Sequence, residues 1–495
     1  MSRIRFSTVL LLLALATPAA AQVPASEYAA RRAALAARIG NGVVLAFGAT
    51  QPMDDAASFR QLPAFHYLTG FHEPDAAFLM VVRDARPTLA MLYVPPRDPR
   101  MQLYDGPPPD SAATVARLGL GGRTLDALRP TLDTLIAAGL PIYSVWDYAS
   151  RDFARTDSLT RGRRFIELLR AAHPGVEVRD AHPHIDALRV VKSRAEIELL
   201  RKAVEMTVDA LEQAMVALRP GMNEAELQTI VECGFRHGGA EGPAFRSIIA
   251  SGPNSTSYHY RANDRDLQAG DVVIMDVGAL YRGYAADVTR TFPVSGKFTP
   301  EQRAIYRLVR EAQAAAEREV RPGAPVAAGD RAIREVLARG LAELGLIQSP
   351  DATFDPPWGG DCSFSPVRCT QAFLYMAHGP GHGIGLEVHD VGGYSYSVTG
   401  RFQEGEVFTI EPGIYIGTHL LDMLPDTPKN RAFIAAVRPV VERYANIGVR
   451  IEDDYIVTAT GAEWISRVPR EIDEIEALMA RGAAGAGSPG ARAGR

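Results

Sequence analysis

The chain has 495 residues, of which 47% are hydrophobic and 22% are charged, and its formal net charge is −5. This composition is typical of a globular protein, and the length is sufficient for two domains with a large buried core. Lysine and arginine are scattered along the chain and form no basic cluster, so nothing in the sequence indicates nucleic-acid binding.

The first 21 residues have the layout of a cleavable export signal. Arg3 and Arg5 precede an apolar run over residues 9–16, and Ala19-Ala20-Ala21 stands directly before Gln22. An uncleaved membrane anchor is the alternative, but the apolar run is much shorter than the ~20 residues that a spanning helix needs. We therefore expect an exported protein, periplasmic or secreted, that starts at about Gln22 and has no membrane span in its mature form.

Residues 22–185 alternate short apolar runs with helical stretches. The runs at residues 43–47, 78–82 and 89–93 have the length and composition of buried strands. This alternation predicts an α/β domain with a proline-rich loop at residues 107–109. The chain turns into a long helix near His182-Pro183-His184, and we place the domain boundary there.

The second predicted domain, residues 186–480, contains two stretches of similar layout. Apolar residues between Ile197 and Met215 recur at three- and four-residue steps, which predicts an amphipathic helix that ends at residues 219–221. A second such helix, around Ile305, ends before residues 321–323. We expect an α+β domain in which helices are followed by strands, and a disordered Gly/Ala-rich tail at residues 481–495.

A predicted β-hairpin carries two aspartates. Residues 272–278 and 284–290 read as its strands, joined by Tyr281-Arg282-Gly283. With the turn centred between Tyr281 and Arg282, Asp276 and Asp287 lie directly opposite each other. Cross-strand partners share one face, with Cβ atoms roughly 4.5–5.5 Å apart. Two carboxylates that close, among apolar neighbours, resist ionisation unless cations sit between them, so the pair predicts a metal site.

The stretch at residues 351–371 contains two of the three cysteines. Cys362 and Cys369 could close a short disulfide loop in an oxidising compartment, or stay free. Cys233 stands alone. Three cysteines placed in this way cannot form a thiolate metal site.

Three further candidate ligands follow along the chain. His382 lies in a glycine-rich stretch, Glu411 precedes Pro412-Gly413 at the end of a strand, and Glu452 follows Arg450-Ile451. Four carboxylates and one imidazole form an oxygen-dominated set that suits Mn²⁺, and Co²⁺, Zn²⁺ or Fe²⁺ are also compatible with it. Two ions roughly 3.5–4 Å apart can share a water, lower its pKa and direct it at a carbonyl carbon.

The ordered ligands and their flanks resemble the pita-bread metallopeptidases, and more narrowly the aminopeptidase P and prolidase group. The stretches that carry the resemblance are residues 275–278, 382–390, 411–413 and 450–453, with a looser match at residues 67–74. The resemblance implies a pita-bread catalytic domain behind a creatinase-like α/β domain. It also implies two divalent ions and hydrolysis of the bond between an N-terminal residue and a following proline.

The resemblance also implies a role for each residue. Asp276 would chelate one ion, Asp287 and Glu452 would bridge both, and His382 with Glu411 would complete the second ion's shell. Glu411 would act as general base and acid. His259 and His389 would bind substrate and stabilise the tetrahedral intermediate, and the positions that match second-shell or substrate-contacting residues are His378, Tyr415 and Arg450. His66 and His72 are interpreted as structural.

The sequence departs from the family pattern at residues 351–371 and 417–446, which look like insertions beside the ligands and put the preferred peptide length and the family's homo-oligomer contacts in doubt. Three alternatives stay open at this point. A prolidase, restricted to dipeptides, has the same ligand set. A binding or scaffold protein without metals and a creatinase-like enzyme share the fold, although both are disfavoured because all five ligand positions are occupied.

Overall fold

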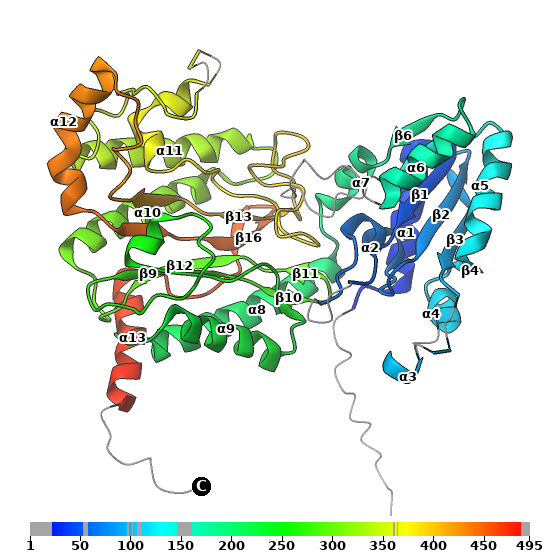
Figure 1. The fold of residues 1–495 in the computed structure, drawn as a ribbon, viewed down its shortest axis with the longest axis horizontal. Helices are drawn as coiled ribbons and strands as arrows, with labels where there is room; N and C mark the ends of the chain where they lie inside the picture. The colour runs from blue at the N-terminus through cyan, green and yellow to red at the C-terminus, as the bar shows by residue number, and fades with distance from the viewer. Residues whose placement is uncertain are drawn as a thin grey trace, which may run out of the picture.

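The computed structural model describes residues 22–52, 58–96, 99–100, 102–105, 111–145, 161–359, 362–363 and 365–486. The described chain forms an N-terminal domain around one sheet and a larger C-terminal domain built on several short sheets (Figure 1). The predicted export signal and the proline-rich loop at 107–109 lie outside the described residues. Among the described helices, none combines the length and the apolar character that crossing a bilayer would require.

The N-terminal domain contains one mixed six-stranded sheet in the order β4-β3-β2-β1-β5-β6. The three apolar runs predicted as strands are confirmed as β1, β2 and β3, which pair antiparallel, while β4, β5 and β6 add in parallel at the edges. The strands are β1 (Gly42–Phe47), β2 (Ala77–Arg83), β3 (Arg86–Val94), β4 (Gly121–Thr124), β5 (Ile142–Ser144) and β6 (Val178–Asp180).

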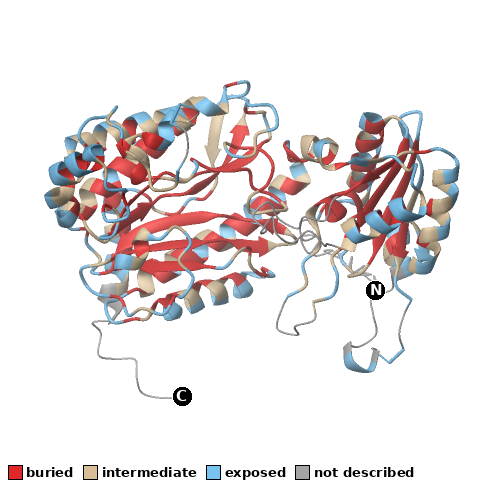
Figure 2. Ribbon diagram, turned by 45° about the horizontal axis from the view of Figure 1, so that its top comes forward, coloured by how far each residue is buried: buried red, intermediate tan, exposed pale blue. Residues whose placement is uncertain are grey.

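Helices pack against this sheet and bury their apolar sides on it (Figure 2). The helix α1 lies beside α2 and α7, and α2 ends at Gly70 in the left-handed conformation that glycine adopts without strain. The helices are α1 (Ala25–Ile39), α2 (Pro63–Thr69), α3 (Gln102–Asp105), α4 (Ser111–Arg117), η1 (Leu125–Ala127), α5 (Leu128–Ala137), α6 (Arg161–Ala172) and α7 (His182–Arg189).

The long helices of the C-terminal domain begin at capping boxes. Ser193, Asn223 and Thr299 cap α8, α9 and α10, and in each case the third helical residue returns a hydrogen bond to the cap. The two predicted amphipathic helices are confirmed as α8 and α10, which end before their Arg-Pro-Gly tripeptides. The helices are α8 (Arg194–Ala217), α9 (Glu224–Gly238), α10 (Pro300–Glu319), α11 (Val326–Glu343), α12 (Pro428–Arg443) and α13 (Ile472–Ala486).

The strands of the C-terminal domain lie between these helices and are buried along most of their length (Figure 2). The sheets β12-β9-β8 and β13-β16-β17 come from different parts of the chain and meet at a bridge between Thr289 and Glu452. The strands are β7 (Gly242–Pro243), β8 (Ile248–Ser251), β9 (Val272–Val277), β10 (Ala279–Tyr281), β11 (Tyr284–Ala285), β12 (Val288–Pro293), β13 (Val407–Ile410), β14 (Gly413–Ile416), β15 (Ile447–Arg450), β16 (Asp453–Thr458) and β17 (Gly461–Trp464).

The two domains share buried contacts. Apolar residues of both domains, such as Phe65 and Tyr284, belong to one hydrophobic cluster. The hydroxyl of Tyr67 donates to the carbonyl of Leu188 at 3.0 Å, and Arg60 donates to the carbonyl of Ala244 at 2.6 Å. These contacts fix the N-terminal domain against one side of the catalytic domain.

The C-terminal end differs from the sequence-based expectation. The helix α13 runs to Ala486, so residues 481–486 are helical although disorder was expected from residue 481 onward. This segment is rich in alanine, which has the highest helix propensity, and it continues a helix already packed on the domain. Residues 487–495 lie outside the described part of the chain.

Cys362 and Cys369 form a disulfide, as one of the two sequence interpretations had it. The bond joins two residues with a sequence separation of 7, so it restricts the unfolded chain only over a short loop. Replacing both cysteines by serine should therefore lower the free energy of unfolding by about 2 kcal/mol. Urea unfolding measures the change. Replacing Cys233, the exposed free cysteine, by serine is the control and should leave the midpoint unchanged. Equal midpoints for all three proteins would show that this loop adds nothing to stability.

Candidate active site

A cleft of about 1110 Å³ has walls from both domains. The C-terminal domain supplies the acidic and imidazole side chains, together with apolar residues such as Leu280, Leu386 and Val388. The N-terminal domain supplies one side of the cleft through Phe59, Arg60, Gln61, Leu62, Pro63, His66 and His72.

All but one of the predicted site residues line this cleft. The exception is Tyr415, which is buried behind it and is 2% exposed. The predicted residues along the cleft are His259, Asp276, Asp287, His378, His382, His389, Glu411, Arg450 and Glu452.

The register of the predicted hairpin was wrong. The structure pairs Asp276 with Thr289 and not with Asp287, because the turn is centred on Arg282-Gly283, one residue later than predicted. Both turn residues have positive φ, 51° and 82°, as a two-residue hairpin turn of type I′ requires, and glycine adopts this conformation readily. Asp287 follows the strand break two residues before Thr289. The two-residue period of a strand therefore still directs both aspartates to one face.

The imidazole of His382 lies at the centre of the acidic group. Its Nε2 atom is 3.6 Å from Asp287 Oδ2, 3.6 Å from Glu411 Oε1 and 3.7 Å from Glu452 Oε1. Its Nδ1 atom is 3.0 Å from the carbonyl oxygen of Gly383. A carbonyl only accepts, so Nδ1 carries the proton and Nε2 directs its lone pair at the carboxylates. This is the tautomer of a metal ligand.

Three carboxylates of this group have raised pKa values. Burial is the main cause for Asp287, Glu411 and Glu452, and the neighbouring carboxylates raise the values further. The pKa of Glu452 reaches about 7. In the absence of cations, these groups therefore hold protons at a pH where an exposed carboxyl is ionised.

The donors fit a divalent cation site. Ligand atoms of Asp287, His382 and Glu452 all lie within 4.8 Å of one another. Asp276 Oδ1, Asp287 Oδ1 and Glu452 Oε1 are buried and have no hydrogen-bond partner among the described residues. Buried carboxylate oxygens without partners are costly, and a bound cation removes that cost. The structure therefore brings together the predicted ligands in an arrangement that calls for positive charge.

Arg450 connects Asp276 to a chain of second-layer residues. Its guanidinium forms an ion pair with Asp276 Oδ2 and donates to the hydroxyl of Tyr415 at 2.7 Å. The Tyr415 hydroxyl lies 3.0 Å from Nε2 of His378, whose Nδ1 is 2.8 Å from the carbonyl oxygen of Gly379. His378 is therefore neutral with Nδ1 protonated, and burial followed by the charge of Arg450 lowers its pKa to about 3.

His389 and His259 reach the cleft from separate loops. The ring of His389 is 4.2 Å from the ring of His382, centroid to centroid, and 6.2 Å from that of Tyr396. His259 is exposed at the cleft wall. Both imidazoles therefore line the cleft, and their contact with substrate stays a prediction.

Several residues of the site were not identified from the sequence. Thr289 donates its hydroxyl to Glu452 Oε2 at 2.8 Å, and Asp454 Oδ2 accepts the backbone N–H of Asp287 at 3.2 Å. His66 and His72, interpreted as structural, line the cleft with ring centroids 4.4 Å apart. The two-residue spacing of Asp287 and Thr289 was the available signal for the threonine. No local pattern could place the N-terminal histidines there, because only domain packing does so.

The two segments that look like insertions lie away from the cleft. No described residue of 351–371 or 417–446 is among those that line it. The second segment contains α12, which lies at the far end of the C-terminal domain from the N-terminal sheet (Figure 1). Although these segments stand beside the ligands in the sequence, their described residues therefore do not form the cleft wall.

A two-domain fold with four carboxylates and one imidazole gathered in a cleft between its domains defines a metal-dependent hydrolase. The chain belongs to metallopeptidase family M24, whose model matches residues 198–459. The model of the aminopeptidase P N-terminal domain matches residues 28–142. The predicted family and fold class, an α/β domain before a pita-bread catalytic domain, are confirmed.

Similar proteins span both peptidase types. The chain is 32% identical to the Xaa-Pro aminopeptidase of Escherichia coli over 466 residues, which cover 92% of this chain and 98% of the relative. It is 36% identical to the human Xaa-Pro dipeptidase over 320 residues, 60% of this chain and 62% of the relative. The solved aminopeptidase P of E. coli with the inhibitor Pro-Leu has a TM-score of 0.76 and 30% identity, and the match covers 94% of this chain and all of that one, 100%.

Proposed function

We propose that this chain is a metal-dependent Xaa-Pro aminopeptidase, which hydrolyses the bond between an N-terminal residue and a following proline. The observation that carries the proposal is the lone pair of His382 Nε2 directed at three carboxylates, with buried carboxylate oxygens around it that accept no hydrogen bond from the described part of the chain. A relative that matches the chain along nearly its whole length, from Escherichia coli, is named Xaa-Pro aminopeptidase.

The proposed ligands are the five predicted residues. Asp276 would bind one ion, Asp287 and Glu452 would be shared by both, and His382 with Glu411 would complete the ligands of the second ion. When bound, two divalent ions polarise the substrate carbonyl and activate water. Mn²⁺ is the proposed metal because the donor set is dominated by oxygen, and Co²⁺, Zn²⁺ and Fe²⁺ are the competing ions.

The protein side chains divide the remaining work. Glu411 is the proposed general base and acid, since its carboxyl lies beside His382 and burial raises its pKa, which favours its taking up a proton. His389 and His259 donate hydrogen bonds to the substrate and to the developing oxyanion. The Arg450, Tyr415 and His378 chain holds Asp276 and the cleft wall in place.

A dipeptidase is the second candidate, supported by the similarity of the catalytic domain to human Xaa-Pro dipeptidase. The size of the cleft favours peptides that extend beyond proline, since about 1110 Å³ exceeds what a small ligand fills. We expect kcat/KM for an Xaa-Pro-Xaa tripeptide to exceed that for the matching Xaa-Pro dipeptide by about ten-fold or more, about 1.4 kcal/mol in transition-state binding.

Parallel assays of both peptides with Mn²⁺ measure this ratio. A tripeptide with alanine in place of proline is the control and should be cleaved poorly. Cleavage confined to the dipeptide would assign the chain to the dipeptidases, and turnover unaffected by chelation would reject the metallopeptidase altogether.

We also propose that the protein is exported to the periplasm or secreted. The proposal rests on the basic, then apolar, then small-residue pattern before Gln22, and the Cys362–Cys369 disulfide is consistent with an oxidising compartment. Fractionation of cells that express the full chain, followed by N-terminal sequencing, tests it. A protein retained in the cytoplasm with Met1 intact would contradict it.

A further inference from the structure

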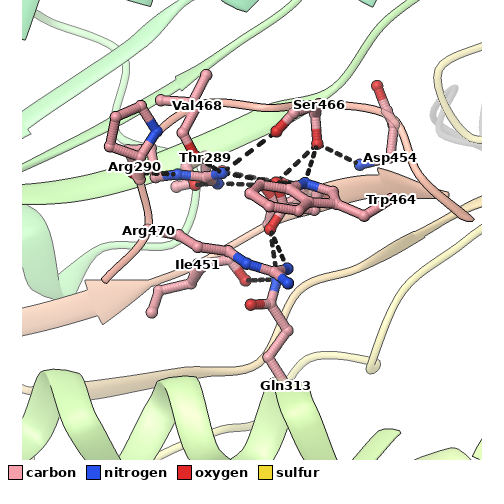
Figure 3. Close-up of polar contacts among 12 residues, drawn as sticks. Thr289, Arg290, Gln313, Ile451, Asp454, Trp464, Ser466, Val468 and Arg470 are labelled. Atoms are coloured by element: carbon pink, nitrogen blue, oxygen red, sulfur yellow. Dashed lines mark hydrogen bonds and ion pairs between the residues drawn. The ribbon is translucent and has the colours of Figure 1, made fainter. Parts of the chain in front are cut away.

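A buried polar cluster surrounds Arg290, on the face of β12 opposite Thr289 and Thr291 (Figure 3). The strand alternates there. Thr289 donates its hydroxyl to Glu452, and Thr291 donates its hydroxyl to the carbonyl of Arg450 at 2.9 Å. Arg290, between them, points away from the cleft and is completely buried.

Arg290 is paired with Asp453, the residue that follows Glu452. The guanidinium Nη2 atom donates to Asp453 Oδ1 at 2.6 Å, and the exposed fraction of both side chains is 0%. Four further donors bind the same carboxylate. Its Oδ1 accepts from Ser466 Oγ at 2.6 Å and from Trp464 Nε1 at 2.7 Å. Its Oδ2 accepts from Gln313 Nε2 at 2.9 Å and from Arg470 Nη1 at 3.2 Å.

Arg290 also binds the main chain of the metal-site residues directly. Its Nη1 atom donates to the carbonyl of Glu452 at 2.8 Å and to the carbonyl of Thr289 at 2.9 Å. Thr289 and Glu452 form a two-way backbone bridge, with N–O distances of 3.3 Å and 3.1 Å. Arg290 therefore holds the main chain where the two sheets meet, from the face of β12 that is turned away from the cleft. On the cleft side, the Thr289 hydroxyl orients the Glu452 carboxylate.

Stability alone is a poor explanation for this pair. Replacing a buried ion pair by apolar residues of similar volume is often neutral or stabilising, because desolvation offsets the Coulomb attraction. Outer residues that orient metal ligands, in contrast, commonly set metal affinity and activity. Arg290 acts on one proposed ligand, Glu452, whose Oε1 faces His382 and has no hydrogen-bond partner among the residues that the structure describes.

We propose that Arg290 is a positioning residue for the metal centre, which holds Glu452 through its main chain and so sets the affinity for divalent ions. The inference rests on the proposed metal site. Arg290→Lys tests it, because lysine keeps the charge but cannot reach the two carbonyls and the carboxylate at once as the planar guanidinium does.

The measurement is release of Mn²⁺ from the loaded full-length protein during titration with a chelator. We expect Arg290→Lys to bind Mn²⁺ about 10–100-fold more weakly. Arg31→Lys is the matched control. Arg31 is also buried, 5% exposed against 0% for Arg290, lies 3.2 Å from Glu196 and donates to the carbonyl of Tyr67, but it contacts no predicted ligand. This control should lower the melting temperature and leave Mn²⁺ affinity unchanged.

Unchanged Mn²⁺ affinity in Arg290→Lys, with a loss of stability like that of the control, would overturn the proposal. If Arg290→Lys does not fold, Trp464→Phe removes a single donor to Asp453 and should weaken Mn²⁺ binding by about five-fold, as expected for one hydrogen bond. Unchanged affinity in that variant would equally overturn it. Failure of the unmodified protein to bind any of Mn²⁺, Co²⁺, Zn²⁺ and Fe²⁺ would instead reject the metal site and the proposed function with it.

Discussion

Asp287→Ala should abolish Xaa-Pro hydrolysis while the protein remains folded. Asp287 lies 3.6 Å from His382 Nε2, and its second oxygen has no hydrogen-bond partner among the described residues. On the proposed assignment its carboxylate binds ions, and it contributes little to the core. Because a bridged pair of ions supplies several kcal/mol of transition-state stabilisation, we expect kcat to fall by about 1000-fold or more.

Removing this carboxylate should also relieve repulsion. Burial and the nearby Glu452 and Asp276 raise the pKa of Asp287, which means that its ionised form is unfavourable in the metal-free protein. The metal-free Asp287→Ala protein should then melt no lower than the metal-free parent near neutral pH. Steady-state hydrolysis and thermal unfolding, recorded on the same preparations, check both expectations.

The matched control is Glu212→Ala. Glu212 also has a pKa raised by burial, but it lies on α8 and does not line the cleft. Its replacement should leave turnover intact. An Asp287→Ala protein that kept a tenth or more of the parental kcat would remove this residue from the metal site.

The long elements could be predicted from the sequence because local signals agreed with the tertiary structure. The helix α8 combines apolar residues at helical spacing with the Ser193 capping box and an Arg-Pro-Gly stop. The strands β1 to β3 are fully or largely apolar runs of the expected length. In each case the residues that define the element lie within one short window of the chain.

The register of the hairpin, in contrast, was predicted wrongly. Moving the turn by one residue shifts the paired partner by two, so Asp276 faces Thr289 although both aspartates still reach the metal site. The face on which each aspartate lies was predictable, because side chains alternate between the two faces of a strand. The register depends on which two residues form the turn. Glycine at the second position favours Arg282-Gly283 over Tyr281-Arg282, so the sequence contained a signal for the register that the prediction did not use.

The sequence did not predict the residues that reach the site from the opposite face of β12 or from the N-terminal domain. Arg290 points away from the cleft, so a search for inward-facing polar residues passes over it. His66 comes to the cleft wall only because α2 packs between the domains. Such positions depend on contacts far apart in the chain, which neither spacing nor composition encodes.

The stabilisation that divalent ions give to the protein should grow as the pH rises from about 5 to 7. In the metal-free protein, burial and neighbouring carboxylates raise the pKa of Asp287, Glu411 and Glu452, the last from 4.5 to about 7. Above the pKa of the unfolded chain, these folded-state groups bind more protons than their unfolded counterparts. Their contribution to stability is therefore lost as the pH rises through this window, by on the order of 3 kcal/mol for Glu452 alone.

Bound cations reverse this loss, because they compensate the ionised carboxylates and compete with protons for them. Melting temperatures with saturating Mn²⁺ and with excess chelator, at pH 5, 6 and 7 and constant ionic strength, give the difference directly. His66 and His378 have lowered pKa values and give the opposite pH slope, but they are present in both samples and so largely cancel in the difference. In Asp287→Ala the gap should stay small at every pH. A gap in the parent that narrowed toward pH 7 would mean that these carboxylates do not share a cation site.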